Sequence, residues 1–529
     1  FKSRGVALGH RLRNRYGTVI KEQLMHAVPA SIDMIRFGVG WGALTRSRGK
    51  RGDARGAYLQ AKLSGPPVFI RIDDRILPPG WTPAGPYGYR RVNNSMYGLQ
   101  RGSCDWGRKA HRVIVDDVKG TYIGDHGEGS LYAYVDPTGA KEATLIIVYA
   151  DDFDVVGPDE DRIYNLLGKK LLFDHTADEA ESNLEELIGM EFWRAPPSTS
   201  GLAHIVMHQH RYASMIVAEY EQRHNKGKPL KPLYTPMLAR EERGSEEQAG
   251  EVERPDQVPE DVPQLESCKE EHGGKPGWLA RGTRPDIAVA QRKISTRYQC
   301  WSRLDDAMIH RVYRYLNVMI CLGFGILEHY DDLRQRQLLI SLRTDSDHAN
   351  DTTTTKSVAG GRTVIRGPRG TWIPFSWWAR RMGQTSRNTG EAETTALDIG
   401  TFEEAVPLQG ILDDLTGVES RIVAEVDNTA CIGAIKRGFS RKLAYLKKAR
   451  RVSLGALHEL YIGDGNPETT ATEEFTINRL LHRTGETSAA DLLTKGFPYD
   501  RHWVLVRRFG MAQAPPAELE KIEQEQEPE

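Results

Sequence analysis

The sequence predicts an α+β region in the first two thirds of the chain and an α/β domain in the last third. Three observations lead to this fold class. An apolar run at residues 145–157 is interrupted by two adjacent carboxylates, as in two strands joined by a tight turn. Residues 241–271 carry twelve acids against three bases and are rich in Pro and Gly, which predicts a disordered linker. From residue 338 onward, strand patterns alternate with helix patterns.

Length and charge narrow the class of protein. A chain of 529 residues should hold roughly three or four domains, and 39% hydrophobic with 27% charged residues is typical of a soluble globular protein. No apolar stretch approaches the roughly 18 residues that cross a bilayer, so we expect no membrane span. Residues 1–56 hold twelve Lys or Arg against three acids, and residues 436–451 hold eight bases and no acid. Such stretches indicate either a nucleic-acid backbone as partner or a solvated basic helix face.

The cysteines and histidines do not predict a metal site. Five cysteines are scattered singly, which argues against a disulfide framework and a cysteine zinc site and fits a reducing, intracellular setting. His204, His208 and His210 have no carboxylate or cysteine in register, so solvent-facing imidazoles are favoured over a metal site. The chain opens at Phe1 with neither Met nor a signal-type apolar region, and we expect it to be a piece of a longer product.

The first two thirds contain two stretches with candidate chemistry. Asp53 precedes a small, aromatic and apolar series, and alone it predicts a turn or cap. Asp151 and Asp152 at the hairpin tip are either a surface turn or two ligands of a divalent cation, because adjacent like charges need positive compensation. The other expected elements are a strand at 68–72, a helix to about residue 118, a helix at 160–173, a strand at 187–192 and helices at 278–326.

In the last third, acids recur where strands end. Strands at residues 338–347 and 422–428 end in Asp345 and Asp427, a helix from residue 391 to about 415 carries Glu393, and Asp491 lies near the end of the ordered chain. Open α/β sheets place their sites at such strand ends. Each group of acids, Asp53 with Asp151 and Asp152 and these four, suits two Mg²⁺ ions for phosphoryl transfer, with Mn²⁺ as an alternative ion.

These motifs, taken together, resemble copia-type LTR retrotransposon Pol polyproteins, in which reverse transcriptase precedes RNase H. The resemblance spans nearly the whole chain, with the motifs in the family's order. In the reverse transcriptase part they are residues 1–9 at the start of the fingers, the short Ala-Pro segment at 27–31, the first palm motif at 53–59, the template grip at 96–99 with Trp106, Tyr149-Ala150-Asp151-Asp152 where the family has Tyr-Val-Asp-Asp, the primer grip at 187–192, and a signature after the palm, Thr283-Arg284-Pro285-Asp286-Ile287. Four RNase H segments follow at 345–347, 391–393, 427–428 and 490–495.

The resemblance implies a right-hand polymerase with fingers, palm and thumb, joined to an RNase H-like domain. Asp53, Asp151 and Asp152 would hold two metal ions in the palm. Tyr58 would exclude ribonucleotides by crowding the sugar 2′ position, and Lys2 and Arg4 would contact the triphosphate. A packed core tyrosine is the alternative for Tyr58. Arg101, aligned with the Gln of the family's Gln-x-Pro, is also predicted to bind nucleotide.

For the second domain, the resemblance implies that Asp345, Glu393, Asp427 and Asp491 hold two metal ions around the scissile phosphate of an RNA strand. His482 either helps product leave or is an exposed loop histidine. An RNA–DNA hybrid would be recognised by its 2′-hydroxyls and shape. The expected partners are an RNA template, a DNA primer, dNTPs and that hybrid, in a cytoplasmic particle or the nucleus, with the chain released from a larger polyprotein.

The expected domains follow from these motifs. They are the reverse transcriptase fingers and palm at 1–237, the acidic linker at 238–274, a helical thumb or connection at 275–335, the RNase H-like domain at 338–500 and an acidic tail at 511–529. Several flanking residues depart from the family: Ser103, the segment Arg387-Asn388-Thr389-Gly390, and Lys442-Leu443-Ala444-Tyr445. Two alternatives therefore stay open, a decayed or domesticated element that binds nucleic acid without catalysis, and a transposase or integrase built on the last third.

Overall fold

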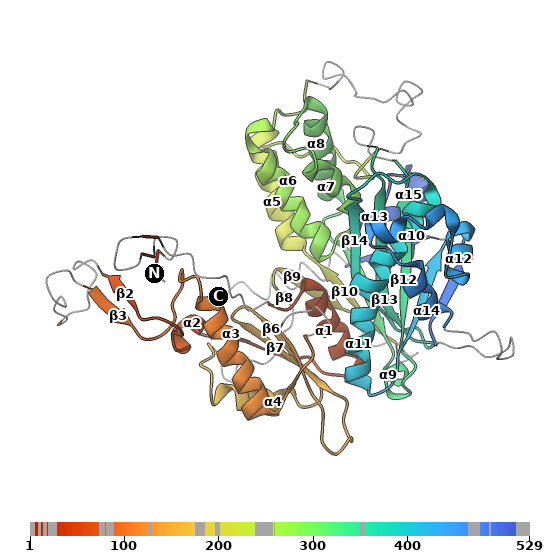
Figure 1. Ribbon diagram of the computed structural model, residues 1–529. Helices are drawn as coiled ribbons and strands as arrows, with labels where there is room; N and C mark the ends of the chain where they lie inside the picture. Colours follow the sequence, from red (N-terminus) through yellow and green to blue (C-terminus); the bar gives the residue numbers. More distant parts are fainter. Residues whose placement is uncertain are drawn as a thin grey trace. The chain divides into compact units, whose positions relative to one another are not determined.

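The chain forms two compact units, residues 1–184 and 185–529 (Figure 1). The computed structural model describes residues 6–8, 12–13, 18–19, 29–72, 80, 89–124, 130–174, 186–195, 202–238, 258, 260–349, 355–463, 477–485 and 488–514. Lys2, Arg4, most of the predicted acidic linker and nearly all of the predicted acidic tail lie outside these residues. Among the described residues, no helix is long and apolar enough to cross a membrane.

The first unit is built on an antiparallel sheet in the order β1-β7-β6-β5-β4. The predicted Asp-Asp hairpin forms its centre, as β6 and β7. A separate hairpin pairs β2 with β3. The strands are β1 (Lys50–Asp53), β2 (Val68–Arg71), β3 (Tyr89–Val92), β4 (Thr121–Tyr122), β5 (Leu131–Tyr134), β6 (Thr144–Tyr149) and β7 (Asp152–Val156).

Helices cover both faces of this sheet. One face packs its alternate side chains, including Ile146, Val148 and Phe153, against α3 (Gly102–Arg112), the π-helix Val113–Val118 and α4 (Glu160–Gly168). The opposite face, with Ile147 and Val156, packs against α1 (Ile32–Leu44). A short helix, α2 (Ala57–Gln60), follows β1. The central strands are therefore buried on both sides, which explains their continuous apolar sequence.

Two glycines allow α1 to approach the sheet closely. A Cβ at Gly38 would lie 2.6 Å from Ile147 Cδ1, and one at Gly42 would lie 2.9 Å from Val156 Cγ1. Because these glycines are four residues apart, they lie on the same face of the helix. The helix backbone thus rests directly on the β6–β7 hairpin and supports it from behind the tip.

The second unit contains one large mixed sheet in the order β16-β15-β12-β13-β14-β11-β10-β9-β8, with β17 also paired to β11. Strands β12, β15 and β16 are parallel, and the other pairs are antiparallel. The strands are β8 (Glu186–Leu187), β9 (Met190–Arg194), β10 (Ala203–His208), β11 (Leu322–Glu328), β12 (Leu339–Asp347), β13 (Val358–Arg366), β14 (Trp372–Arg381), β15 (Arg421–Val426), β16 (Arg479–His482) and β17 (Met511–Gln513).

Two sets of helices accompany this sheet. The first is a layer of long helices beside the β8–β11 end: α5 (His210–His224), α6 (Lys269–Gly282), α7 (Ala288–Ser295) and α8 (Arg303–Val318) (Figure 1). The second set follows β11 and the later strands: α9 (Tyr330–Arg334), α10 (Thr389–Ile399), a π-helix (Gly400–Ala405), α11 (Val406–Thr416), α12 (Thr429–Lys436), α13 (Leu446–Arg450), α14 (Leu454–Tyr461) and α15 (Tyr499–Arg508). Short 3-10 turns stand at Glu266–Cys268, Pro285–Ile287, Arg441–Leu443 and Ala489–Leu493.

Several expected elements need correction. Residues 187–192 form a hairpin, β8 to β9, because Ile188 and Gly189 both take positive φ and make a two-residue turn. Helix α6 and the turn before it begin at residues 266–269, inside the segment assigned to the linker, since this stretch packs on α5 and α8. The first compact unit ends at residue 184, and β8, β9 and β10 join the large sheet of the second unit.

Candidate active sites

The first candidate centre lies where β1 ends beside the tip of the β6–β7 hairpin. The antiparallel register of β1 and β7 places Asp53 directly opposite Asp152. The backbone N–H of Ala54 then donates to the Asp151 carbonyl at 2.8 Å, which continues the pairing onto the tip. Hydrogen bonding of the two strands therefore brings together three acids that are separated by almost a hundred residues in the sequence.

The hairpin tip is a strained two-residue turn that a tryptophan holds in place. Tyr149 and Asp152 pair across the hairpin, so Ala150 and Asp151 make the turn, and Ala150 has a φ of 57°. A residue with a Cβ rarely adopts this conformation. Trp106, buried in α3, donates its Nε1–H to the Ala150 carbonyl at 2.7 Å. Packing and this hydrogen bond together fix the direction in which the two acids project.

If the first centre has the polymerase activity that the motif resemblance implies, Trp106→Phe should lower primer extension by about tenfold, since a small misplacement of the tip costs activity. The lost hydrogen bond should also destabilise the first unit by about 1–3 kcal/mol. Trp41→Phe is the matched control. Trp41 is also buried and donates Nε1–H to a carbonyl, that of Ala143 at 2.9 Å, which lies at the end of β6 opposite the tip. Urea unfolding should give similar losses of stability for both variants, with extension lowered only in Trp106→Phe. Equal extension by the two variants would contradict the positioning role.

Positive charge already lies beside this centre. The Arg51 guanidinium is 3.0 Å from Asp152 Oδ2 and 3.9 Å from Asp154 Oδ1. Burial raises the pKa of Asp154 to about 7, with Arg51 acting against this shift. Asp53 is exposed, whereas Asp151 and Asp152 are half-buried. The donor set is three carboxylates at adjacent strand ends, which fits hard divalent cations. The ligand oxygens of these three acids do not all lie within 4.8 Å of one another.

The other residues predicted for this centre have different surroundings. Tyr58 packs its ring 4.7 Å from that of Tyr97, and burial, followed by the charge of Asp151, raises the pKa of Tyr58. Arg101 is buried and donates Nη2–H to the Pro66 carbonyl at 2.7 Å. Its guanidinium therefore holds the loop at residues 65–66. Lys2 and Arg4 lie outside the described residues.

The second candidate centre lies at the ends of β12 and β15 in the mixed sheet. Asp345 is on β12, Asp427 directly follows β15, Glu393 is on α10 and Asp491 is in the 3-10 turn Ala489–Leu493. Ligand oxygens of Asp345, Glu393 and Asp427 all lie within 4.8 Å of one another. Asp427 is half-buried, and the other three acids are buried. The parallel pairing of β12 with β15 aligns the strand ends, as expected for open α/β sheets.

Helix caps position two of these acids. The Asn428 side chain accepts from the backbone N–H of Cys431, which starts α12 immediately after Asp427. The Asn388 side chain accepts from the N–H of Glu391, which starts α10 one turn before Glu393. Asn388 belongs to a segment that departs from the family pattern, and it still provides an N-cap.

Two of the departing segments pack on each other. The Arg387 guanidinium lies 4.6 Å from the centre of the Tyr445 ring, and the Tyr445 hydroxyl donates to Glu391 Oε2. The same Glu391 oxygen accepts from the Arg387 N–H at 2.8 Å. The changed residues therefore form one network that supports the start of α10.

Three polar residues that the sequence analysis did not single out hold the second centre. Ser346 donates Oγ–H to Glu393 Oε1 at 2.9 Å, and its N–H lies 3.2 Å from the same oxygen. Thr494 donates its hydroxyl to Asp345 Oδ2. Lys495 Nζ lies 3.7 Å from Asp345 Oδ2 and 3.5 Å from Asp491 Oδ2. The spacing of Asp491 and Lys495, four residues apart, was the available sequence signal for this ion pair.

Burial and mutual repulsion raise the pKa values of three acids in the second centre. Burial, then the charges of Asp345 and Asp427, raise the pKa of Glu393 to about 9. Burial, then the charge of Asp345, raise the pKa of Asp491 to about 7, and burial also raises the pKa of Asp427. Two buried oxygens, Glu393 Oε2 and Asp491 Oδ1, have no hydrogen-bond partner among the described residues. Crowded carboxylates with free oxygens fit a divalent metal ion, which would remove both the repulsion and the unsatisfied atoms.

We expect the stability of the second unit to fall as pH rises from about 5 to about 9, because Glu393 binds its proton more tightly in the folded chain than in the unfolded one. Above pH 9, the free energy of unfolding is lower by about 1.4 kcal/mol for each unit by which folding raises the pKa of Glu393. Thermal unfolding followed by circular dichroism should show a decrease in Tm on the order of 10 °C, which Mg²⁺ reverses. Glu393→Gln should remove most of this decrease, and a wild-type Tm that rises over this range would contradict the expectation.

One histidine, His208, differs from expectation. His208 is buried, 1% exposed, with Nδ1 3.5 Å from Glu191 Oε2, so the solvent-facing position favoured for it is wrong. The carboxylate partner comes from β9, which pairs with β10, and this pairing could not be read from the local sequence. His482 is exposed on β16, with Nε2 3.1 Å from the Asp427 carbonyl.

Several solved structures are similar to this chain, and three of them are given below. No protein-family model and no curated protein matches the chain. The foamy viral protease-reverse transcriptase in complex with an RNA/DNA hybrid aligns at 9% identity over 88% of this chain and 47% of its own, with a TM-score of 0.39. The native prototype foamy virus protease-reverse transcriptase aligns at 11% identity over 75% of this chain and 60% of its own, with a TM-score of 0.17. LC11-RNase H1, isolated from compost by a metagenomic approach, aligns at 20% identity over 30% of this chain and 92% of its own, with a TM-score of 0.21.

The chain thus spans about half to three fifths of the two foamy virus chains. These three solved structures are two reverse transcriptases and an RNase H. Because each TM-score is below 0.5, the proposals below rest on the strand pairing and the carboxylates rather than on these likenesses.

Proposed function

We propose that this chain is an RNA-directed DNA polymerase with RNase H activity, of the copia type that its motifs resemble. The observation that carries the proposal is the presence, in one chain, of two separate carboxylate centres at strand ends. Asp53 faces Asp152 across β1 and β7 in the first unit, and Asp345, Glu393 and Asp427 converge in the second. Phosphoryl transfer by pairs of divalent cations requires such acids.

In the first unit, Asp53, Asp151 and Asp152 would hold two Mg²⁺ ions, and in the second unit Asp345, Glu393, Asp427 and Asp491 would hold two more. Bound there, the ions would activate the nucleophile and neutralise charge on the phosphates. The hairpin tip, fixed by Trp106 and by α1, orients the first set of acids. Tyr58, close enough to Asp151 for its pKa to respond to that charge, would crowd a ribose 2′-hydroxyl.

The residues around the second centre would orient its carboxylates toward the RNA strand. Ser346 holds Glu393 and Thr494 holds Asp345, so both carboxylates are oriented before substrate arrives. The half-buried Asp427 leaves the centre open to solvent on one side. Lys495 partly balances the charge of Asp345 and Asp491, which lowers the repulsion that an incoming phosphate would meet.

Two assays test the proposal with the full chain. Primer extension on poly(rA)/oligo(dT) with Mg²⁺ should yield extended DNA, and a labelled RNA strand paired with DNA should be cut. A wild-type chain that extends no primer removes the polymerase proposal, and an RNA strand that stays intact removes the ribonuclease proposal.

The second candidate function is nucleic-acid binding without catalysis. Two contacts favour this candidate. The Arg101 guanidinium donates to the Pro66 carbonyl, and Arg51 forms an ion pair with Asp152 in the first centre. A chain that binds a hybrid tightly in a filter assay, with neither extension nor cleavage, would support this candidate over the enzyme.

A further inference from the structure

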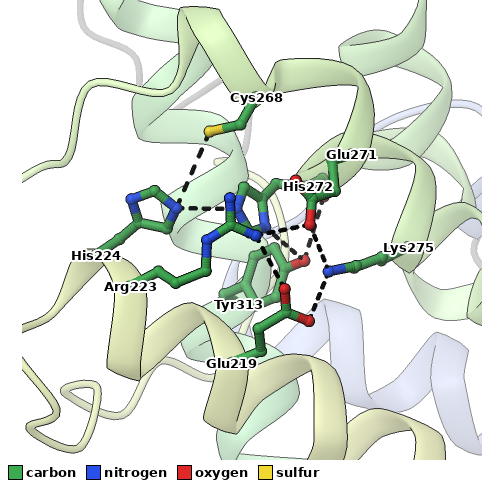
Figure 2. Close-up of polar contacts among 8 residues, drawn as sticks. All are labelled: Glu219, Arg223, His224, Cys268, Glu271, His272, Lys275 and Tyr313. Carbon is green, nitrogen blue, oxygen red and sulfur yellow. Dashed lines mark hydrogen bonds and ion pairs between the residues drawn. The ribbon is translucent and has the colours of Figure 1, made fainter.

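Two imidazoles and one thiol converge in the helical layer of the second unit, outside both carboxylate centres. His224 ends α5, Cys268 ends the 3-10 turn before α6, and His272 lies on the first turn of α6 (Figure 2). His224 Nε2 lies 2.9 Å from His272 Nε2 and 4.0 Å from Cys268 Sγ. The ligand atoms of all three residues lie within 4.8 Å of one another.

We propose that His224, Cys268 and His272 bind one Zn²⁺ ion. Tetrahedral zinc with its usual bond lengths separates two nitrogen ligands by about 3.3 Å and a nitrogen from a sulfur ligand by about 3.6 Å. The observed separations of 2.9 Å and 4.0 Å differ from these values by only about 0.4 Å, which side-chain rotation can supply. Two nitrogens and one sulfur select zinc over Mg²⁺, whereas the oxygen-only carboxylate centres have the opposite preference.

An ion-pair network beside the cluster joins the two helices that carry it. Arg223 Nη1 lies 2.9 Å from Glu219 and 2.7 Å from Glu271, and Lys275 Nζ lies 2.6 Å from Glu219 and 2.9 Å from Glu271. Figure 2 shows this network beside the imidazoles, with Glu219 and Arg223 on one helix and Glu271 and Lys275 on the other. Two positive and two negative charges balance, and the carboxylates are engaged by cations. Three protein ligands and one water molecule would therefore complete a four-coordinate site.

The surroundings of His272 favour the tautomer that a metal requires. The Tyr313 hydroxyl donates to the His272 carbonyl at 3.4 Å and lies 3.5 Å from His272 Nδ1, so it can accept from a protonated Nδ1. A proton on Nδ1 leaves the lone pair of Nε2 directed at His224. His272 is fully buried, and burial disfavours the charged form of an imidazole. His224 and Cys268 are half-buried and provide a path from solvent. On binding, a sulfur–zinc bond forms at Cys268 and the thiol proton passes to solvent.

The position of the cluster indicates what the ion would do. His224 and Cys268 are 44 residues apart in the sequence, and the Pro- and Gly-rich acidic stretch lies between them. One zinc ion would close this loop and fix the start of α6 against the end of α5. Closing a long loop reduces the conformational freedom of the unfolded chain, so the ion would stabilise the helical layer and take no part in phosphoryl transfer.

The test uses the full chain, stripped of metal with a chelator and then titrated with Co²⁺ and Zn²⁺ in excess Mg²⁺, which occupies the carboxylate centres. Wild type should bind one equivalent of Zn²⁺ by elemental analysis and show the thiolate-to-Co²⁺ charge-transfer absorption. Cys268→Ser should show neither this absorption nor the bound equivalent of Zn²⁺. Tyr313→Phe, which keeps the packed ring, should bind about 10–100-fold more weakly.

Cys321→Ser is the matched control, because Cys321 Sγ also lies close to an imidazole, 3.5 Å from His210 Nδ1, outside the three-residue cluster. It should bind metal as wild type does. Circular dichroism of each metal-free variant establishes that it is folded. Absence of uptake by wild type, or equal uptake by Cys268→Ser and Cys321→Ser, would overturn the proposal and leave a hydrogen-bonded pair of imidazoles. Primer extension and RNA cleavage are measured separately, so their failure leaves this test intact.

Discussion

Asp151→Asn is expected to lower primer extension by about 10³-fold or more while the chain remains folded. The substitution removes a negative charge at the point where β1 meets the hairpin tip, and a metal-binding acid stabilises the transition state by several kcal/mol, with about 1.4 kcal/mol for each factor of ten. Folding should be kept, because Asn has the same shape and the N–H of Ala54 donates to the backbone carbonyl of residue 151. Single-nucleotide incorporation on poly(rA)/oligo(dT) measures the effect.

Asp117→Asn provides the same change of charge elsewhere in the first unit. Asp117 Oδ1 lies 2.9 Å from Lys170 Nζ on the surface, where an ion pair contributes little to stability. This control should extend primers at the wild-type rate. If Asp151→Asn also extends primers at that rate, the first centre does not carry polymerase activity.

Asp345→Asn is expected to abolish RNA cleavage, again by about 10³-fold or more, and to leave primer extension unchanged. Asp345 is the acid whose charge raises the pKa of Glu393, Asp427 and Asp491, so it lies at the middle of the second centre. Its neutralisation should lower those pKa values and reduce the loss of stability at high pH. Cleavage of a labelled RNA strand in a hybrid, together with thermal unfolding at two pH values, measures both effects.

Asp414→Asn is the control for this variant, because Asp414 is exposed on α11. The two catalytic variants also control each other: Asp151→Asn should still cut RNA, and Asp345→Asn should still extend primers. Loss of both activities in either variant would indicate that the chain has unfolded or that one centre serves both reactions.

Much of the local structure could be predicted from the sequence. The apolar hairpin, the strands at 68–71 and 339–347, the helix that ends near residue 118 and the strand before Asp427 all form where the patterns indicate. These elements are set by short-range causes, namely apolar periodicity, turns and helix caps. The hairpin at residues 186–194 was missed because its turn uses Ile188, a residue type that seldom takes positive φ.

Features that depend on long-range packing were harder to predict from the sequence. The burial of His208 depends on β9, and the grouping of Cys268 with His224 and His272 depends on how α6 packs against α5. The boundary at residue 184 depends on β8, β9 and β10 pairing into the second sheet. Each of these features results from contacts between segments that are distant in the sequence, for which no local pattern exists.

By itself, the sequence determined the identities and order of the seven acids and the strands or helices that carry them, because periodicity and turn chemistry act within a few residues. Only the tertiary structure decided that Asp53 faces Asp152 and that Asp345, Glu393 and Asp427 lie within 4.8 Å of one another. The physical reason is that strand register and helix packing are chosen by the burial of apolar faces over the whole unit. That arrangement raises the pKa values of Glu393, Asp427 and Asp491, and a divalent cation would counter the repulsion.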